Sequence, residues 1–433
     1  MLNCKYKIMK KGLSFFVIVC VIAIMWTFQG CKKATIPELT TMAISDVGLT
    51  SAVSGGTIIT DGGEEITEKG VCWSTSANPT VADSKTSDGK GSANFNSNIV
   101  GLSEGTTYYV RAYATNEVGT AYGNELSFTT GKVTNAVLTT TEVSNVTSTS
   151  AVAGGNITDD GGGSITARGV CWGTSPNPTV NKTTDGTGKG TFTSNITGLV
   201  DGTVYYYRAY ATNSSGTSYG QEFSFITPVT DIDGNVYITV KIGTQVWMAE
   251  NLKTTKYNDG SLIPNVIESD EWKALGTDAY CWANNDEKTN KPLYGALYNW
   301  FVAETEKICP SGWRVPSDED FINLELTLGL PQDEINIWGW RGTDQGQQMK
   351  NTSGWLPNEN GNNNSGFTAL PGGYRYYSTG GFEAIGTVGY FWSSTEPMDP
   401  STAFYRRLDG VENRIHRSAT LKQAGKSIRC IKD

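Results

Sequence analysis

Histidine is almost missing from this chain of 433 residues, in which His416 is the only one. A single imidazole excludes metal sites built from several histidines, and it excludes Ser-His-Asp hydrolysis unless His416 itself is the base. Basic residues are also few relative to acids, 34 against 43, so the formal net charge is −9. This charge argues against a dedicated nucleic-acid-binding protein.

Proline is scarce as well, with 14 residues against 50 glycines. That composition is typical of a folded chain with many tight turns and not of a proline-rich disordered one. The length suggests about three domains. Near the N-terminus, an apolar run over residues 13–28 follows four lysines. It is shorter than the roughly twenty residues of a membrane-spanning helix and is typical of a signal peptide.

The apolar run ends in Phe28-Gln29-Gly30-Cys31, a small residue directly before a cysteine. This ending resembles the lipobox of bacterial lipoproteins. The resemblance implies cleavage after residue 30 and lipidation of the Cys31 thiol, and two or more acyl chains anchor a protein stably. The alternative is an uncleaved signal anchor with an incidental cysteine. We therefore expect a signal peptide over 1–30, a short tether over 31–38 and an exported lipoprotein at the outer membrane or cell surface.

The region from 39 to 228 is an internal duplication. Gly70-Val71-Cys72-Trp73 recurs as Gly169-Val170-Cys171-Trp172, an offset of 171 − 72 = 99. A period near 100 residues with alternating apolar positions predicts one β-sandwich per repeat. We place the two sandwiches at 39–131 and 138–228. Cys72 and Cys171 lie in separate repeats, so we expect two buried free thiols and no disulfide between them.

Each repeat also contains Leu-x-x-Gly-Thr-x-Tyr, which ends at Tyr108 and at Tyr205. This motif resembles the tyrosine corner of fibronectin type III and related immunoglobulin-like domains. The resemblance implies that each tyrosine hydroxyl bonds back to the main chain and has a structural role. Neither repeat holds a catalytic pattern, so we interpret both as spacers.

The region 231–433 differs in composition and holds nine of the twelve tryptophans. Six blocks, at 241–252, 294–300, 309–317, 366–375, 391–396 and 427–432, resemble the Fibrobacter succinogenes major paralogous domain. The most distinctive block is Cys309-Pro310-Ser311-Gly312-Trp313-Arg314-Val315-Pro316-Ser317. The resemblance implies surface lipoproteins of the Bacteroidota and Fibrobacterota with a largely unassigned activity, and remotely a C-type-lectin-like fold. The expected fold class is thus multidomain: two all-β sandwiches and an α+β lectin-like domain.

A helix is predicted after this block from the residues alone. Ser317 is a suitable N-cap, and Asp320 three residues later can complete a capping box. Phe321, Leu324 and Leu328 form one apolar stripe, and Gly329 is expected to end the helix. Capping explains the acidic residues of the first turn better than a metal cluster does.

Three cysteines lie in this last domain, at positions 281, 309 and 430, and an exported protein favours pairing. The likeness to lectin-like domains implies a disulfide between Cys309 and Cys430, with Cys281 free. A bridge between Cys281 and Cys309 is the alternative.

Two segments are candidates for binding calcium, the only cofactor that the sequence suggests. Asp231, Asp233 and Asn235 resemble the start of a calcium loop, but no glutamate stands at the twelfth position, and an Asx-stabilised turn is the other interpretation. The asparagines of a second segment can ligate calcium or bond sugar hydroxyls, or they form a polar surface loop. The asparagines concerned are Asn358, Asn360, Asn362, Asn363 and Asn364.

Aromatic and basic side chains supply the remaining candidates. Trp282 and Trp392 are candidates for stacking on sugars, and aromatic core is the alternative. The tail from residue 403 holds eight basic residues against three acids, which suits an anionic ligand or solvated strand faces. These residues are Arg406, Arg407, Arg414, Arg417, Lys422, Lys426, Arg429 and Lys432.

No catalytic constellation is identifiable, since no pair of carboxylates can be placed at a defined separation. The first hypothesis is a non-catalytic binding or adhesion domain for a polysaccharide or protein, displayed on a stalk of two sandwiches. The second is an enzyme or accessory protein of extracellular polysaccharide processing. The third is a structural envelope component. The expected partners are the membrane, through the lipid anchor, and an extracellular glycan or protein, but not nucleic acid.

Overall fold

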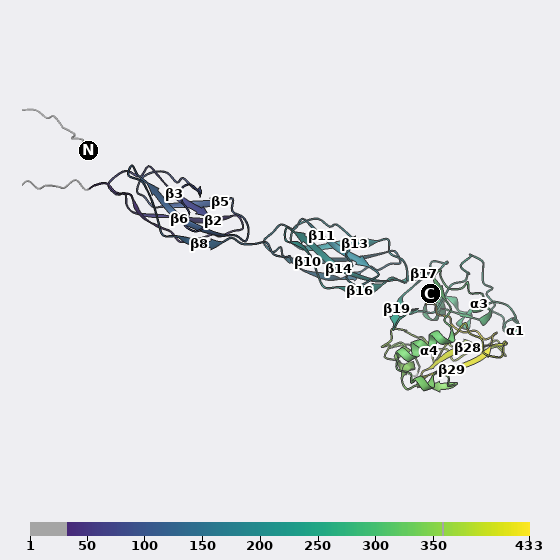
Figure 1. Ribbon diagram of the computed structural model, residues 1–433. Helices are drawn as coiled ribbons and strands as arrows, with labels where there is room; N and C mark the ends of the chain where they lie inside the picture. The colour runs from purple at the N-terminus through teal and green to yellow at the C-terminus, as the bar shows by residue number, and fades with distance from the viewer. Residues whose placement is uncertain (1–32, 357–358) are drawn as a thin grey trace, which may run out of the picture. The chain divides into compact units, whose positions relative to one another are not determined.

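The computed structural model describes residues 33–356 and 359–433, and the chain divides into two compact units at Lys132/Val133 (Figure 1). The predicted signal peptide, Cys31 and Asn358 lie outside the described residues. Within the described part of the chain, no helix has the length and apolar character needed to cross a bilayer.

The first unit is a β-sandwich of two antiparallel sheets. The strands are β1 (Glu38–Thr41), β2 (Ser51–Thr60), β3 (Glu68–Ser74), β4 (Ser84–Lys85), β5 (Phe95–Val100), β6 (Thr107–Thr115), β7 (Thr120–Tyr122) and β8 (Leu126–Thr129). One sheet has the order β1-β2-β5, and the other has the order β4-β3-β6-β7 with β8 beside β6. In β5 every second residue is buried, as a strand with one face on the core requires.

The second unit begins with a sandwich of the same topology. Its strands are β9 (Val137–Ser144), β10 (Ser150–Asp159), β11 (Ala167–Gly173), β12 (Asn181–Lys182), β13 (Gly190–Thr197), β14 (Val204–Asn213), β15 (Gly216–Tyr219) and β16 (Phe223–Ile226). The sheet orders are β13-β10-β9 and β12-β11-β14-β15, with β16 beside β14. The duplication seen in the sequence is therefore a duplication of the fold.

The tyrosine corner forms in both sandwiches. The hydroxyl of Tyr108 accepts a hydrogen bond from the backbone N–H of Ser103, and that of Tyr205 accepts one from Val200, each at 3.0 Å. Cys72 and Cys171 are buried free thiols, as expected. These residues therefore stabilise the sandwiches and present no reactive group.

The rest of the second unit, from Val229 to Asp433, we call the head. Its strands are β17 (Val229–Thr230), β18 (Val236–Tyr237), β19 (Thr239–Ile242), β20 (Gln245–Met248), β21 (Tyr280–Trp282), β22 (Ala296–Tyr298), β23 (Trp313–Arg314), β24 (Gly339–Arg341), β25 (Tyr374–Arg375), β26 (Phe382–Glu383), β27 (Val388–Trp392), β28 (Thr402–Asp409), β29 (Glu412–Leu421) and β30 (Ile431–Lys432). Its helices are α1 (Ser269–Lys273), α2 (Glu287–Tyr294), α3 (Trp300–Glu304), α4 (Asp318–Thr327) and α5 (Gln345–Met349), with 3-10 turns η1 (Ala283–Asn285) and η2 (Gln332–Glu334).

Two four-stranded antiparallel sheets organise the head. The first has the order β19-β20-β30-β23, and the second, which we call the distal sheet, has the order β24-β29-β28-β27. Two buried clusters pack against the opposite faces of the distal sheet. One contains Phe321 and Leu324 of α4 with Leu408 and Ile415, and the other contains Trp392 and Ala403.

Helix α4 begins and ends as the sequence predicts. Ser317 and Asp320 form the capping box: Asp320 N–H donates to Ser317 Oγ at 3.1 Å, and Ser317 N–H donates to Asp320 Oδ2 at 2.7 Å. Phe321 and Leu324 are buried, and Gly329 takes a φ of +94° directly after the C-cap Leu328. A positive φ of this kind is strained for residues with a side chain, so glycine suits the end of the helix.

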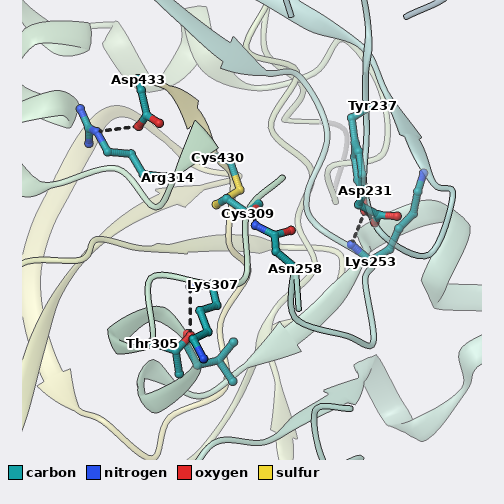
Figure 2. The surroundings of a disulfide bond; sticks show 11 residues. Asp231, Tyr237, Lys253, Asn258, Thr305, Lys307, Cys309, Arg314, Cys430 and Asp433 are labelled. Carbon is teal, nitrogen blue, oxygen red and sulfur yellow. Dashed lines mark hydrogen bonds and ion pairs between the residues drawn. A yellow bond between two sulfur atoms is a disulfide. The ribbon is translucent and has the colours of Figure 1, made fainter. Parts of the chain in front are cut away.

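Cys309 and Cys430 form the disulfide that the family resemblance implies, with an S–S distance of 2.00 Å. Figure 2 shows the bridge near the ion pair of Arg314 and Asp433, whose Nε and Oδ1 are 3.6 Å apart. The bridge lies beside paired strands, since Trp313 of β23 is opposite Lys432 of β30. Cys281 is a buried free thiol, so the alternative bridge to Cys281 is not formed.

Candidate functional site

Trp282 and Trp392 do not meet the prediction that they stack on a ligand. Trp282 is only 3% exposed, and Trp392 is fully buried with its Nε1–H donating to Tyr298 O at 2.9 Å. Both rings belong to the large apolar cluster of the head. They lie in the core because β21 and β27 are buried on both faces, so the aromatic-core alternative is correct for both.

The asparagine-rich segment is held together by its own amides. Asn360 Oδ1 accepts from Trp355 N–H at 3.0 Å, and Asn363 Oδ1 accepts from Thr368 N–H at 2.8 Å. Asn362 and Asn364 are exposed, and Asn362 Oδ1 accepts from Asn364 N–H at 3.1 Å. These bonds stabilise a polar loop and engage the side-chain oxygens of Asn360, Asn362 and Asn363 with backbone donors.

The aspartates at the start of the head form an Asx-stabilised turn. Asp231 Oδ1 accepts from Asp233 N–H and Asn235 N–H, and its Oδ2 accepts from Asn235 Nδ2 and from the Tyr237 hydroxyl. Asp233 pairs with Lys256 at 2.9 Å. Burial alone would raise the pKa of Asp233, but the donors around it hold that pKa down to about 2.

Protein donors therefore occupy the oxygens that a calcium ion would need in this turn. Across the described parts of the chain, no group of three or more histidines, cysteines or acids is placed to hold a metal.

Most of the basic tail is buried, so the interpretation of these residues as solvated strand faces is wrong for Arg406, Arg417, Lys422, Lys426 and Arg429. The reason is that acids and rings far away in the sequence meet them inside the head. Two of those acids lie on the inner side of helix α4. The sequence predicts this helix and its N-terminal cap, but not the role of these acids.

Asp318 and Glu325 of α4 form a buried ion-pair network with three arginines. Arg406 donates to Asp318 Oδ1 at 2.7 Å and to Glu325 Oε1 at 2.6 Å. Arg417 binds the second oxygen of Asp318 at 2.6 Å, and Arg341 binds the second oxygen of Glu325. Burial would raise the pKa of Asp318, but bonds from Arg417 and Arg406 outweigh it and hold that pKa low. The network fastens α4 to one face of the distal sheet.

The opposite face of the distal sheet carries the candidate site, a row of five side chains that we call the cation–aromatic row. Trp340 lies opposite His416, His416 opposite Arg407, and Arg407 opposite Tyr390 in the strand register. Lys426 follows, because the chain at Ser427 bridges to Phe391 in parallel and Ser427 N–H donates to Tyr390 O. The row thus crosses four strands and the segment beside them.

Each cation of the row lies against aromatic rings. The rings of Trp340 and His416 are 4.8 Å apart, and the Arg407 guanidinium carbon lies 5.4 Å from the Trp340 ring and 5.9 Å from that of Tyr390. Lys426 Nζ lies 4.2 Å from the Tyr390 ring. Such contacts contribute about 0.5–2 kcal/mol each, more where water is excluded.

Exposure decreases along the row. Trp340, Arg407 and His416 are half-buried, whereas Tyr390 is 8% and Lys426 2% exposed. Burial, and secondarily the charge of Arg407, lowers the pKa of His416. Burial raises the pKa of Tyr390 to about 12. The outer end can therefore contact a ligand, while the buried inner end supports it.

Lys426 is enclosed by four rings, those of Tyr374, Tyr390, Trp392 and Tyr405, at 4.2 to 5.2 Å from Nζ. Burial, with a smaller effect of Arg407, lowers its pKa from 10.5 to about 7. The rings themselves favour the ammonium form, so they limit the cost of keeping this charge inside the head.

We expect Lys426 to make stability depend on pH. Between about pH 7 and pH 10.5 the unfolded chain holds a proton that the folded chain has lost, so the free energy of unfolding rises with pH in that window. The slope from one group is at most about 1.4 kcal/mol per pH unit. Urea denaturation from pH 6 to about 8, below the ordinary pKa values of cysteine and tyrosine, should show this rise.

The control for this experiment is a matched pair of variants. Lys426→Met should remove the rise, and Lys307→Met, which replaces an exposed lysine, should keep it. Parallel pH curves for the wild type and Lys426→Met would contradict the assignment of the titration to Lys426.

The sequence contains one local signal for this row. Arg406 and Arg407 are neighbours in a strand, and neighbours in a strand point to opposite faces. The first belongs to the buried network and the second to the row. The alternation of side chains along 402–409 therefore predicts that Arg406 and Arg407 lie on opposite faces of the strand. The sequence does not predict that Arg407 lies near Trp340 and Lys426, because those contacts form across the sheet.

Comparison with known proteins finds one matching family model and a number of similar solved structures. Residues 240–432 match the family model of the Fibrobacter succinogenes major domain. No curated protein matches the chain. A two-domain fibronectin type III segment of chicken tenascin is similar at 13% identity and TM-score 0.20, covering 44% of this chain and 97% of that one.

The second similar structure holds domains FN1–FN3 of chicken CNTN1. It is 11% identical at TM-score 0.20, covering 45% of this chain and 69% of that one. The sandwich architecture is established by the strand pairing.

Proposed function

We propose that this chain, whose residues 240–432 match the Fibrobacter succinogenes major domain, is a surface-displayed lipoprotein with a non-catalytic binding head. The observation that carries the proposal is the outer end of the cation–aromatic row, where Trp340, Arg407 and His416 are half-buried together on one sheet face. Flat rings beside hydrogen-bond donors are suited to binding a sugar or a protein side chain.

A binding role, as opposed to a catalytic one, is supported by the ion pairs that the acids near the row form. Asp409 pairs with Arg407, and Glu412 pairs with Arg414 at 2.7 Å. Glu412 is a poor general acid, because its hydrogen bonds with Arg414 lower its pKa to about 2. Burial with Arg407 nearby also lowers the pKa of His416.

The remaining parts of the proposal concern display. We assign residues 1–30 to a lipoprotein signal peptide and Cys31 to lipidation, which would place the protein at the outer membrane or cell surface. The two sandwiches then act as spacers. We also propose a C-type-lectin-like α+β fold for the head, on the likeness of its sequence blocks and on the combination of α4, the distal sheet and the Cys309–Cys430 bridge.

Binding is tested with an array of polysaccharides and the exported chain. Trp340→Ala should abolish or weaken binding at least about tenfold, because loss of an aromatic platform removes both contact area and the stacking energy. Trp338→Ala is the matched control: Trp338 is 55% exposed but packs on Phe404, away from the row. Binding unaffected by Trp340→Ala would contradict the assignment of the binding site to the row, and an array without any binding would contradict a polysaccharide ligand.

Anchoring is tested by labelling cells with palmitate. The protein should incorporate the label, and Cys31→Ala should abolish incorporation. A labelled Cys31→Ala variant would contradict lipidation at this residue.

A further inference from the structure

The last strand of the head reaches back to the second sandwich. Lys432 of β30 donates through Nζ to the backbone oxygens of Asp201 and Gly202, at 3.2 and 2.8 Å. It also donates to Thr203 Oγ1 at 2.9 Å. These acceptors lie in the loop of the tyrosine corner, residues 199–205, which we call the corner loop. One ammonium group thus binds three acceptors that lie 229 to 231 residues away in the sequence, within the same compact unit.

The ring of Trp313 packs on the same loop. Trp313 of β23 lies opposite Lys432 in the strand register, and a Cβ at position 202 would lie 2.1 Å from Trp313 Cζ2. Gly202 is buried and has a φ of +50°. A side chain at this position would therefore be strained and would also collide with the indole, so glycine permits the close approach of the head.

The first sandwich provides a reference for this contact, because its corner loop has the same motif. Gly105 stands where Gly202 stands in the second sandwich, and its φ is +59°. Gly105 is exposed, and a Cβ there would meet only the side chain of Lys132, at an ordinary 3.5 Å. The turn requires glycine in both sandwiches, and in the second sandwich the glycine also makes room for Trp313.

The connection between the second sandwich and the head is short and partly buried. It consists of Thr227 and Pro228, between β16 and β17. Thr227 is fully buried, and its backbone oxygen accepts from Thr239 Oγ1 of β19 at 3.0 Å. Val229, the next residue, belongs to the large apolar cluster of the head. Proline fixes φ, whereas the residue at the corresponding place after the first sandwich is an exposed glycine, Gly131.

We infer that the second sandwich and the head form one cooperative folding unit, joined by Lys432 and Trp313 at the corner loop. This inference goes beyond the proposed binding function and does not depend on its ligand. Separation of the two domains would expose the indole to water and remove three acceptors from one ammonium at the same time. The second sandwich is therefore a structural part of the head as well as a spacer, and it fixes the orientation of the head.

The experiment is hydrogen–deuterium exchange of the exported chain at increasing urea, followed by mass spectrometry of its peptides. It measures the urea concentration at which each element loses protection. We expect peptides from β10 and β14 of the second sandwich to lose protection together with peptides from β20 and β29 of the head. Loss of protection at clearly different urea concentrations in the two domains would overturn the inference.

A matched pair of variants tests the contact with Trp313. Gly202→Ala and Gly105→Ala both place a methyl group on a glycine of positive φ in the same motif, but only the first meets the indole. Gly202→Ala should raise the exchange rate of head peptides that contain Trp313 or Lys432 about tenfold or more. Gly105→Ala should leave those rates unchanged. Strain confined to the corner loop would not change exchange in the head, so this readout isolates the coupling.

Lys432→Met tests the ammonium without adding a side chain to the loop. It should raise the exchange rate of the corner loop about tenfold or more and separate the urea transitions of the two domains. Lys307→Met, which replaces an exposed lysine elsewhere in the head, should do neither. The inference is supported if Gly202→Ala or Lys432→Met separates the transitions, and it is overturned if neither does. Polysaccharide binding is a separate measurement, so failure of the proposed function leaves this test unchanged.

Discussion

Glu325→Gln is expected to destabilise the head by about 3–5 kcal/mol, the usual effect of removing one partner from a buried ion pair. Glu325 is fully buried and accepts from two arginines, Arg406 and Arg341, whose side chains are also fully buried. Glutamine keeps the shape of the side chain but leaves the three guanidinium groups of the network with one carboxylate, that of Asp318, which Arg406 and Arg417 bind. The affected element is α4, which the network fastens to the distal sheet.

The measurement is chemical denaturation followed by tryptophan fluorescence, since nine of the twelve tryptophans lie in residues 231–433. Glu319→Gln is the matched control, because Glu319 is an exposed acid one residue after Asp318 on the same helix. It should change the free energy of unfolding by less than about 0.5 kcal/mol. Equal effects of the two substitutions would show that the network does not stabilise the head.

Removing the disulfide by Cys309→Ala with Cys430→Ala is expected to destabilise the head by about 2–5 kcal/mol. The cysteines are 121 residues apart, so the bond restricts a large part of the unfolded chain. In the chain-entropy treatment, long loops give values near the top of that range.

The test uses denaturation with and without a thiol reductant. Reductant should lower the stability of the wild type to that of the double variant and leave the double variant unchanged. Cys281 is a buried free thiol and is common to both proteins, so its chemistry cancels in the comparison. A wild type that is insensitive to reductant, once mass spectrometry shows the bond to be reduced, would contradict the stabilising role.

Features fixed by nearby residues are predictable from the sequence. The cap of α4 depends on Ser317 and Asp320, three residues apart, and the sandwich duplication is visible as recurring motifs about 100 residues apart. The Cys309–Cys430 bridge is implied by the family resemblance, because three cysteines alone leave several pairings open.

Features fixed by distant residues are not predictable in this way. Arg406 meets Glu325 across 81 residues and Asp318 across 88. Nothing in the local pattern separates such an arginine from one on a solvated strand. For the same reason the sequence makes Trp282 and Trp392 candidates for a ligand, since a tryptophan has the same local signal in a core and on a platform.

The candidate site escapes prediction because it depends on the strand register. Trp340, Tyr390, Arg407, His416 and Lys426 come from five separate segments, and their neighbourhood arises from pairing across the distal sheet. A shift of one residue in any of those strands would turn its side chain to the other face. Sequence alone does not give that register.

The position of the disulfide has a mechanical consequence. Trp340, Tyr390, Arg407, His416 and Lys426 all lie between Cys309 and Cys430, inside the covalent loop that the bond closes. Tension that enters the head from residue 231 can extend the chain only as far as Cys309 before it passes across the sulfur atoms to Cys430. About 400 Å of contour length, at roughly 3.3–3.6 Å per residue, is thereby withheld from extension. Unfolding of the strands before Cys309 would therefore leave the row inside a covalently closed loop.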